Sequence, residues 1–409
     1  MRLLYVCPLV PFPPDSGART RAFHIVRGLA AGGAEIHAVC IDLPSRAEWI
    51  EELRRFFAAV YFFPVERRDT TYWRGKSSAL LSSSPEMVRS FRSEAAALKI
   101  AAVLGQVPFD LAHFEMLRAG EFLIQNHTRL PSVLSEHNLE YRRIEREYRG
   151  RSLAPRQRAF GSLEVFKTKR FERLATRAAR LVVHTTEQDA AEAKALSPHT
   201  QFAVIPNGVD HDYFQPVTNF GKQGPPSLIF TGTLSYWPNE DAVRYFTSDI
   251  LPLIRAMHPN VAFIVAGQDP PASLVTDLKR VPNVKVMGNV PDMRPLFADA
   301  DVFVCPLRAG GGSRLKLLDA MAMAKPVVST SLGAEGIALD QDTGFIANTP
   351  LEFSRAVGHL LDGPEVRERL GRNGRALVVE HYDWRKSVDE LACLYGEIVA
   401  RAHNRSESN

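Results

Sequence analysis

Short apolar runs alternate along the chain with longer segments in which apolar residues recur every three or four positions. The runs predict β-strands buried on both faces, and the wider spacing predicts helices that cover them. In the first half the predicted strands are Leu3–Leu9, Glu35–Leu43, Val60–Val65, Asp110–Phe114, Ser132–Glu136 and Leu181–Thr185. The predicted helices are Phe23–Ala31, Trp49–Ala58, Pro85–Leu104 and a long stretch over Leu139–Ala179. This order is typical of a parallel sheet with helices on both faces.

A second series of the same kind follows in the other half of the chain. Its predicted strands are Leu228–Gly232, Val261–Gly267, Val284–Gly288, Val302–Pro306 and Pro326–Ser329. The polar, Gly- and Pro-containing segment 215–226 predicts a linker. We therefore expect an α/β fold of two doubly wound, Rossmann-like domains, 1–214 and 227–383, facing a central cleft. A helix over 384–402 is expected to pack back across both domains, followed by a flexible tail at 403–409.

The composition is that of an ordinary globular protein, with 45% hydrophobic and 23% charged residues among 409. A strand pattern begins at Arg2, which leaves no room for a signal peptide, and no apolar run approaches the roughly 18 to 20 residues of a membrane span. We therefore expect a cytoplasmic protein. The four cysteines lack the spacing of a zinc site or a disulfide framework, so buried thiols are expected.

The net charge of +4 is small, but the segment from Arg142 to Arg180 contains thirteen Lys or Arg against four Glu. Three interpretations are open: a helix with a solvated basic face, docking on an anionic membrane surface, and nucleic-acid binding. No nucleic-acid-binding motif or aromatic platform accompanies the charge, so nucleic acid is not expected as a partner. The membrane interpretation places the protein at the periphery of the inner face of the cell membrane.

The segment with the most distinctive chemistry reads RAGGGSRLKLLDAMAMAK and spans residues 308–325. It follows a predicted strand and opens into an apolar helix. Glycines let a ligand approach the backbone closely, and the free N–H groups of a helix start favour an anion such as phosphate. The predicted cradle consists of Gly310, Gly311, Gly312 and Ser313, with Ser313 as the N-cap.

Two cations, Arg314 and Lys316, fall in the first turn of this predicted helix. Cations there oppose the helix dipole by roughly 0.3 to 1 kcal/mol each, so their placement favours an anion bound between them and the turn. A solvated first turn is the alternative, because Gly-rich strand-to-helix turns are common in α/β proteins without a ligand there.

The motifs along the chain resemble those of the retaining GT-B glycosyltransferases of family four. They are, in order, PPDSGARTR, HTTEQDA, VIPNGVD, FTGTL, GNV, GGGSRLKLLDAMAMAKPVV and GAEG. Within that family the chain looks most like bacterial sugar transferases of exopolysaccharide systems, including those associated with exosortases. The resemblance implies a nucleotide-sugar donor held by the C-terminal domain, UDP- or GDP-linked rather than ADP-linked. It also implies a glycan or lipid-linked acceptor, held mainly by the N-terminal domain, and no obligatory cofactor.

The resemblance also suggests roles for the residues of the Gly-rich segment. A nucleoside diphosphate gains negative charge as it leaves, so Arg314 and Lys316 are the predicted catalytic cations. The family's paired glutamates, separated by seven residues, are matched only in part. Asp319 stands at the second position, where it is expected to accept hydrogen bonds from ribose hydroxyls. Gly311 stands at the first, which leaves recognition of the donor sugar to backbone groups.

Five further residues are expected at the site. Gly288 and Val290 lie in the turn where the family holds the base, and Glu335 lies in a second donor loop. Gly17 opens the first helix after PPDS, beside Arg19. His137 ends a predicted strand and is expected to orient a donor hydroxyl or a backbone carbonyl. For each of these positions, an ordinary turn or a packed histidine is the alternative.

One pattern is rejected as a metal motif. Asp299 and Asp301 resemble a DxD pair, but they precede a buried strand, so helix-end and strand-start roles are expected and no metal is predicted. The leading hypothesis is a glycosyltransferase of bacterial surface-glycan synthesis, acting on a lipid-linked acceptor; Tyr72 and Trp73 add to the lipid interpretation. The alternatives are a catalytically silent binding subunit, suggested by the missing acid at Gly311, and a nucleotide-sugar 2-epimerase on the same fold.

Overall fold

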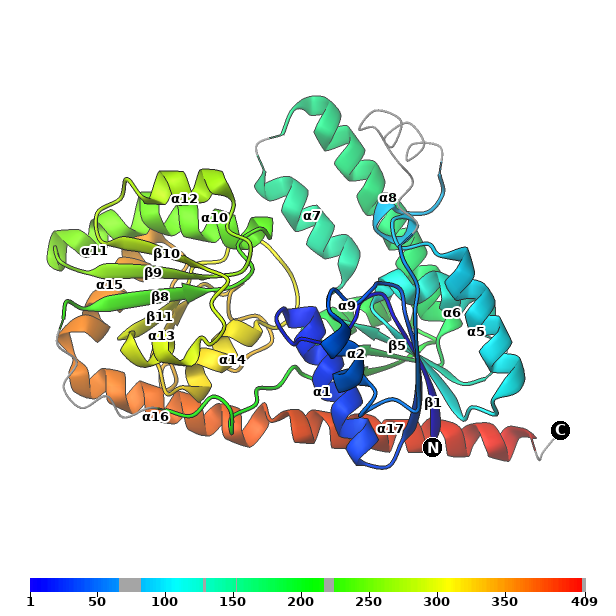
Figure 1. Ribbon diagram of the computed structural model, residues 1–409. Coiled ribbons are helices and arrows are strands. Elements are labelled where there is room, and N and C mark those ends of the chain that lie inside the picture. The colour runs from blue at the N-terminus through cyan, green and yellow to red at the C-terminus, as the bar shows by residue number, and fades with distance from the viewer. Residues whose placement is uncertain (66–81, 128–129, 152, 217–223, 407–409) are drawn as a thin grey trace. The chain divides into compact units, whose positions relative to one another are not determined.

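The computed structural model describes residues 1–65, 82–127, 130–151, 153–216 and 224–406 (Figure 1). Contacts divide the chain into two compact units. The first consists of Met1–Pro206 and Ser387–Asn409, and the second of Asn207–Lys386. Each unit is an α/β domain built on one parallel sheet. The predicted linker at 215–226 lies largely outside the described residues.

The first unit contains a seven-stranded sheet in the order β3-β2-β1-β4-β5-β6-β7, with every described pair parallel. Its strands are β1 (Arg2–Cys7), β2 (Glu35–Cys40), β3 (Ala59–Phe62), β4 (Leu111–Glu115), β5 (Ser132–Glu136), β6 (Leu181–His184) and β7 (Gln201–Val204). The six predicted strands are confirmed. The short edge strand β7 was not predicted, because its four residues are only partly buried.

Helices cover both faces of this sheet. They are α1 (Gly17–Ala31), α2 (Ala47–Leu53), α4 (Glu86–Arg89), α5 (Glu94–Gln106), α6 (Gly120–Asn126), α7 (Glu140–Gly150), α8 (Pro155–Ala178) and α9 (Glu187–Leu196). Alternate residues of β1 enter different cores: Tyr5 packs in a cluster with residues of α1 and the last helix, whereas Leu4 packs with residues of α5, α6 and α8. The first unit is therefore doubly wound, as predicted.

The predicted long helix over 139–179 is wrong in one respect: it is two helices, α7 and α8. The break follows from Gly150 at the end of α7 and Pro155 at the first position of α8, where the missing proline N–H costs nothing. The two helices pack closely. A Cβ on Gly161 would lie 2.2 Å from Cδ1 of Tyr148, so only glycine fits at that contact.

The second unit contains a six-stranded parallel sheet in the order β10-β9-β8-β11-β12-β13. Its strands are β8 (Ser227–Thr231), β9 (Ala262–Gly267), β10 (Val284–Gly288), β11 (Val302–Cys305), β12 (Val327–Ser329) and β13 (Phe345–Ile346). Its helices are α10 (Trp237–Tyr245), α11 (Leu251–Met257), α12 (Ala272–Leu278), α13 (Arg294–Asp299), α14 (Leu315–Ala322), α15 (Pro350–Asp362) and α16 (Pro364–His381). The five predicted strands are confirmed, and the two-residue β13 was not predicted.

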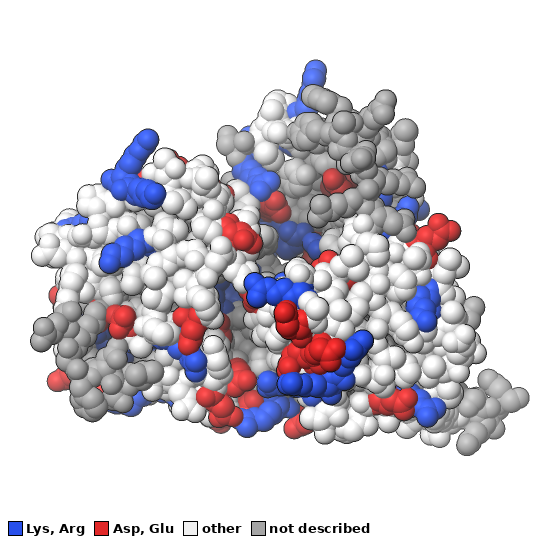
Figure 2. All heavy atoms as spheres, viewed as in Figure 1, with Lys and Arg blue, Asp and Glu red and all other residues white. Residues whose placement is uncertain are grey.

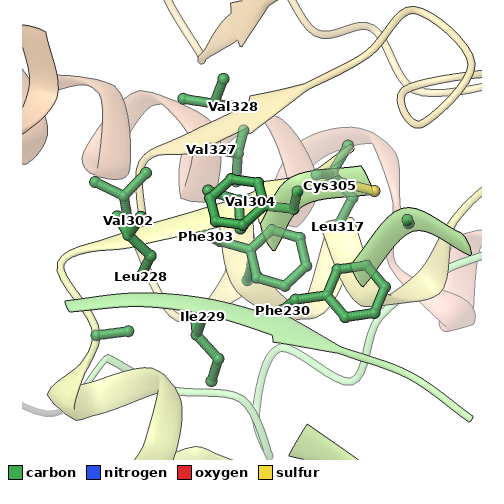
Figure 3. Close-up of a cluster of buried hydrophobic side chains, with 14 of the residues drawn as sticks. Leu228, Ile229, Phe230, Val302, Phe303, Val304, Cys305, Leu317, Val327 and Val328 are labelled. Atoms are coloured by element: carbon green, nitrogen blue, oxygen red, sulfur yellow. The ribbon is translucent and has the colours of Figure 1, made fainter. Parts of the chain in front are cut away.

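The core of the second unit lies around its central strands β8, β11 and β12. Figure 3 shows Phe230 of β8 and Phe303 of β11 in the same apolar cluster as Leu317 of α14, and all three are fully buried. This packing fixes α14 against the sheet, and with it the Gly-rich segment that precedes the helix.

The last helix, α17 (Trp384–Ser406), begins in the second unit and belongs to the first from Ser387 onward. It continues past residue 402, so 403–406 are helical, whereas the sequence predicted that the helix ends at 402. Near its start a Cβ on Gly208 would lie 2.6 Å from the backbone N of Trp384, and Val209 pairs with Asp383. Among the described residues, no helix is long and apolar enough to cross a membrane.

Candidate functional site

The predicted donor residues of the second unit gather at one edge of its sheet. The Gly-rich segment follows β11, the loop with Glu335 follows β12, and the turn with Val290 follows β10. Because the strands are parallel, these loops lie at the carboxyl edge, together with the β8 loop that begins at Gly232. This edge is where doubly wound sheets bind ligands.

Lys316 reaches from α14 to the loop after β8. Its Nζ lies 2.6 Å from Oδ1 of Asn239 and 4.2 Å from the ring centroid of Phe230. Gly232, with φ of +151°, makes room for it, because a Cβ there would lie 2.5 Å from Nζ. Burial, with the neighbouring Arg314 cation, lowers the pKa of Lys316 to about 8, although Cys305 and Asp319 oppose the shift. The ammonium therefore lacks a full counter-charge.

Asp319 follows one turn later on α14, so its carboxylate lies on the side of the helix that carries Lys316. Burial raises the pKa of Asp319 to about 7, with Lys316 opposing the shift. No hydrogen bond to its carboxylate is found within the described residues, so its oxygens can accept from a ligand. Two perturbed groups of opposite charge at the carboxyl edge of a sheet are typical of a binding or catalytic site.

Arg314 bonds to the glycine loop, and some of its hydrogen-bond donors have no partner among the described residues. Its Nη1 donates to the carbonyl of Gly311, and a Cβ on Gly310 would lie 2.9 Å from Nη2. Gly310 and Gly312 have φ of +116° and +69°, conformations that favour glycine. The buried Nε and Nη2 of Arg314 have no hydrogen-bond partner among described residues. Unmatched guanidinium donors beside the backbone of a glycine loop suit an anionic oxygen.

The predicted N-cap is wrong: α14 begins at Leu315, so Arg314 and not Ser313 is the N-cap residue. Arg314 adopts extended backbone angles, which start the helix one residue late and take the Ser313 hydroxyl out of reach of the first N–H groups. In the part of the chain that is described, the buried Oγ of Ser313 has no partner.

Hydrogen bonds hold both the turn that is predicted to contact the base and the loop that is predicted as a second donor loop. Asn289, between Gly288 and Val290, has φ of +52°; its N donates to Gly267 and its Oδ1 accepts from the N of Asp269 at 3.1 Å. Glu335 is half-buried and lies in the loop after Thr330. The hydroxyl of Thr330 donates to the carbonyl of Leu307 at 2.6 Å and accepts from the N of Gly333 at 2.9 Å. The roles predicted for Gly288, Val290 and Glu335 stay predictions.

In the first unit, Gly17 is the exposed first residue of α1. The nearby Arg19 is already paired, because its Nη1 lies 3.2 Å from Oδ1 of Asp15. The charge of Arg19 is therefore partly countered, and donor contact by Gly17 stays a prediction.

His137 follows β5 directly, and its Nε2 bonds to Oε1 of the buried Glu115 at the end of β4. Glu115 also receives bonds from the hydroxyl of Tyr5 at 2.6 Å, Nε2 of His113 at 2.7 Å and Oγ of Ser135 at 3.3 Å. Burial alone would raise the pKa of Glu115, but the two histidines and their hydrogen bonds outweigh it and hold that pKa well below its ordinary value.

Sequence reasoning singled out His137 but missed Glu115, Tyr5 and His113. A signal was present, since His113 lies in the strand predicted over Asp110–Phe114 and Glu115 follows it directly. Residues two apart in a strand lie on one face. Polar side chains that face a core need partners, so the pattern indicated a buried polar network.

The basic segment divides between its two helices. Cations of α7 are paired: Arg142 with Glu192 at 2.5 Å, Arg143 with Glu140 at 2.7 Å. Further i,i+4 pairs lie along α7 and just after it, with Arg149–Glu145 at 2.8 Å and Arg151–Glu147 at 3.2 Å. Over the face shown in Figure 2, basic and acidic side chains are interspersed. The aromatic residues Tyr72 and Trp73 lie outside the described residues.

On α8, in contrast, the two acids Glu164 and Glu172 are buried, at 5% and 3% exposure. The exposed residues at helical spacing, which we call the α8 basic face, are Arg158, Phe166, Arg170, Arg173, Leu174 and Arg177. Phe166 is 65% exposed and Leu174 47%. Within the described chain, the four arginines of this face have no acidic partner.

The DxD-like pair lies at the amino end of β11, away from the carboxyl edge of the sheet. Asp299 ends α13, and Asp301 accepts a hydrogen bond from the backbone N of Ser227 at 2.8 Å. The expected helix-end and strand-start roles are thus confirmed. Across the described residues, no group of three or more His, Cys, Asp or Glu is arranged to hold a metal ion.

Comparison with known protein families identifies the family of the chain. A family model described as glycosyl transferases group 1 matches residues 225–363, and one described as glycosyl transferase 4-like domain matches residues 16–208. Together they cover most of the chain and both of its sheets. The chain therefore belongs to the family-four glycosyltransferases with the GT-B fold.

Two curated relatives are similar over part of their length. A GDP-mannose-dependent monoacylated alpha-(1-6)-phosphatidylinositol monomannoside mannosyltransferase of Corynebacterium glutamicum is 29% identical over 210 residues, 46% of this chain and 55% of the relative. A UDP-Gal:alpha-D-GlcNAc-diphosphoundecaprenol alpha-1,3-galactosyltransferase of Escherichia coli is 24% identical over 252 residues, 58% of this chain and 63% of the relative. The chain thus spans a little over half the length of these relatives.

Two solved structures share the fold over nearly the whole chain. Sucrose-phosphate synthase from Thermosynechococcus elongatus has a TM-score of 0.73 at 16% identity, covering 98% of this chain and 100% of that one. Anabaena HepE in complex with UDP and glucose has a TM-score of 0.69 at 15% identity, covering 97% and 100%.

Proposed function

We propose that this protein is a retaining glycosyltransferase that moves a sugar from a UDP- or GDP-linked donor to a glycan acceptor. The observation that carries the proposal is the carboxyl edge of the second sheet, where Lys316, Arg314 and Asp319 surround a glycine loop. Family membership supports this over a silent binding subunit or an epimerase, and HepE supports the donor class because it was solved with UDP.

The chemistry requires positive charge where the diphosphate leaves. Breaking the bond to the sugar places negative charge on the phosphate oxygens, and groups already fixed around them stabilise that charge without reorganising. Lys316 supplies an incompletely countered ammonium, and Arg314 supplies its two unmatched donors. The diphosphate would in turn raise the pKa of Lys316, which favours the bound state.

Asp319 is proposed to receive the ribose hydroxyls, and backbone groups at Gly310, Gly311 and Gly312 to meet the donor sugar in place of the family's first acid. We propose no covalent nucleophile. The leaving phosphate can itself take the proton of the acceptor hydroxyl, so few protein groups need to titrate. We also propose that no metal is obligatory, because the two cations provide the charge that a metal would supply.

For the acceptor we propose a lipid-linked glycan of bacterial exopolysaccharide or surface-glycan synthesis, used at the inner face of the membrane. Two observations support this. The names of the two curated relatives specify phosphatidylinositol-linked and diphosphoundecaprenol-linked substrates. The α8 basic face combines four arginines that have no acidic partner among the described residues with two exposed apolar side chains, a composition that suits an anionic lipid surface.

The test is a thermal-shift panel with UDP, GDP, ADP and their common sugar conjugates. A ligand at 100 times its dissociation constant stabilises a protein by about 2.7 kcal/mol, which moves a melting curve visibly. We expect UDP or GDP to stabilise the wild type, and Lys316→Ala to lose roughly 2 kcal/mol of binding, since it removes a charge-assisted contact.

The matched control is Lys279→Ala, which removes an exposed cation at the end of α12 in the same unit. It should bind nucleotide as the wild type does. Equal nucleotide binding by wild type and Lys316→Ala would refute the site, and no response to any nucleotide would refute the donor class.

A further inference from the structure

The first unit contains a buried anion that its fold does not require. Glu115 is fully buried at the end of β4. Moving a carboxylate out of water costs several kcal/mol even in real proteins, and apolar residues of similar volume are often as good or better for stability. A buried carboxylate next to the carboxyl edge of a sheet therefore indicates a use beyond stability.

The bonds to Glu115 determine where the protons of the network lie. An ionised carboxylate only accepts hydrogen bonds, and its four contacts, described above, occupy both oxygens. Both histidines must therefore carry hydrogen on Nε2. In neutral His113 the remaining Nδ1 is then an acceptor, and it lies 2.5 Å from the hydroxyl of Tyr395 on α17.

The same reasoning determines which ring nitrogen of His137 carries hydrogen. Its backbone carbonyl accepts from Oγ1 of Thr185 at 3.1 Å, and its ring is held by Glu115, so both ends of the residue are anchored. In the neutral ring, Nδ1 is the acceptor. No partner for Nδ1 is found in the described parts of the chain, and the side chain is 10% exposed.

A second observation points to the same place. Met116, the residue after Glu115, has φ of 65° and ψ of 152°, although it is not a glycine. Such a conformation costs on the order of 1 to 3 kcal/mol and persists where the surrounding structure imposes it, often at functional sites. Its N donates to the carbonyl of Ser135 at 2.7 Å, which ties the strained residue to β5 directly before His137.

We propose that Glu115 is a positioning residue for His137: it fixes the Nε2–H form of the ring, so that Nδ1 accepts a hydrogen bond from a sugar hydroxyl of the substrate. Only the last step rests on the proposed function. The fixed ring form is a property of the first unit alone and can be measured without any substrate.

The experiment is long-range ¹H–¹⁵N NMR of the histidine rings in the full chain, with His137→Gln used to assign the signal. In the wild type, His137 is expected as the Nε2–H form. In Glu115→Gln, where the amide can meet the ring as donor or acceptor, we expect a mixture of both neutral forms. A wild-type ring that carries hydrogen on Nδ1, or a ring form unchanged in Glu115→Gln, would overturn the proposal.

Kinetics test the last step, with release of UDP from UDP-glucose, or of GDP from GDP-mannose, as the probe. Glu115→Gln should lower kcat roughly 10- to 100-fold, as expected when a hydrogen bond in the transition state is lost, and leave nucleotide binding unchanged. Unchanged kcat would overturn the sugar contact. If the wild type releases neither nucleotide, the proposed function fails, while the ring form still decides the role of Glu115.

The matched control is Glu164→Gln, a second buried carboxylate of the first unit, which accepts the backbone N–H of Glu86 at 2.8 Å. It should leave the ring form of His137 and kcat unchanged. If Glu115→Gln does not fold, the wild-type ring form and Tyr395→Phe decide instead. That variant removes the partner of Nδ1 of His113 but leaves Glu115 in place, so both rings should keep hydrogen on Nε2. A ring that changes form in Tyr395→Phe would overturn the proposal.

Discussion

The incompletely countered ammonium of Lys316 makes nucleotide binding depend on pH in a predictable direction. Its pKa is about 8 without ligand, and a bound diphosphate would raise that pKa. Above pH 8 the free protein loses the proton that the complex retains, so binding must take up a proton and weaken as pH rises. We expect the dissociation constant of UDP or GDP to increase above pH 8.

The size of the effect follows from the same value. With a free pKa of about 8, a tenth of Lys316 is charged at pH 9, so affinity falls about tenfold between pH 7 and pH 9, or roughly 1.4 kcal/mol. A terminal phosphate, with a second pKa near 6, is already about nine-tenths ionised at pH 7 and changes little above it. Isothermal titration calorimetry at several pH values measures the fall, and buffers of different ionisation enthalpy reveal the proton uptake.

Two variants test whether Lys316 causes the fall in affinity above pH 8. Lys316→Met keeps an apolar stem over Phe230 but has no proton to take up, so its weaker binding should not change between pH 8 and pH 9. Asp319→Asn tests the other titrating group, whose pKa of about 7 affects binding mainly below pH 8. It should retain the fall above pH 8. The reasoning would be refuted by a wild type whose affinity is flat from pH 7 to 9, or by a Lys316→Met variant that shows the same fall.

Two further predictions concern the first unit. Arg170→Glu combined with Arg173→Glu should abolish cosedimentation with vesicles rich in phosphatidylglycerol, whereas Arg149→Glu on α7 should bind nearly as the wild type; equal loss in both would contradict docking by the α8 basic face. Burial raises the pKa of Glu172 to about 7 and that of its neighbour Glu136 well above the ordinary value. Their stabilising contribution is present below about pH 4.5 and is lost as pH rises through 7, so Glu136→Gln should flatten the pH dependence of unfolding in urea, and an unchanged slope would contradict this.

The fold was predictable because the hydrophobic pattern reports burial directly. The strands of both sheet centres are buried and mainly apolar, and every predicted strand is present. Edge strands carry a weaker signal: β7 is only partly buried and β13 has two residues, so neither stood out. The break before Pro155 was visible in the sequence, yet the basic pattern on both sides of it reads as one continuous helix.

The candidate site was predictable only where its residues are neighbours in the chain. Lys316 and Asp319 lie within one turn of a single helix, so the segment shows both at once. Asn239, which holds Lys316 at 2.6 Å, lies 77 residues away in α10, and no spacing rule connects them. Glu115 and His137 are 22 residues apart and meet only because β4 and β5 are neighbours in the sheet.

The basic segment shows why the number of charges counted along the sequence is a poor guide to docking on a membrane. Its thirteen cations count equally in such a sum, but the structure pairs Arg142, Arg143 and Arg149 of α7 with glutamates and leaves the arginines of the α8 basic face exposed. Each unpaired cation near an anionic leaflet contributes about 1 kcal/mol, so four arginines give about 4 kcal/mol. The exposed Phe166 and Leu174 add apolar burial. That is enough for reversible attachment and far less than a membrane anchor, so attachment should weaken strongly as salt rises.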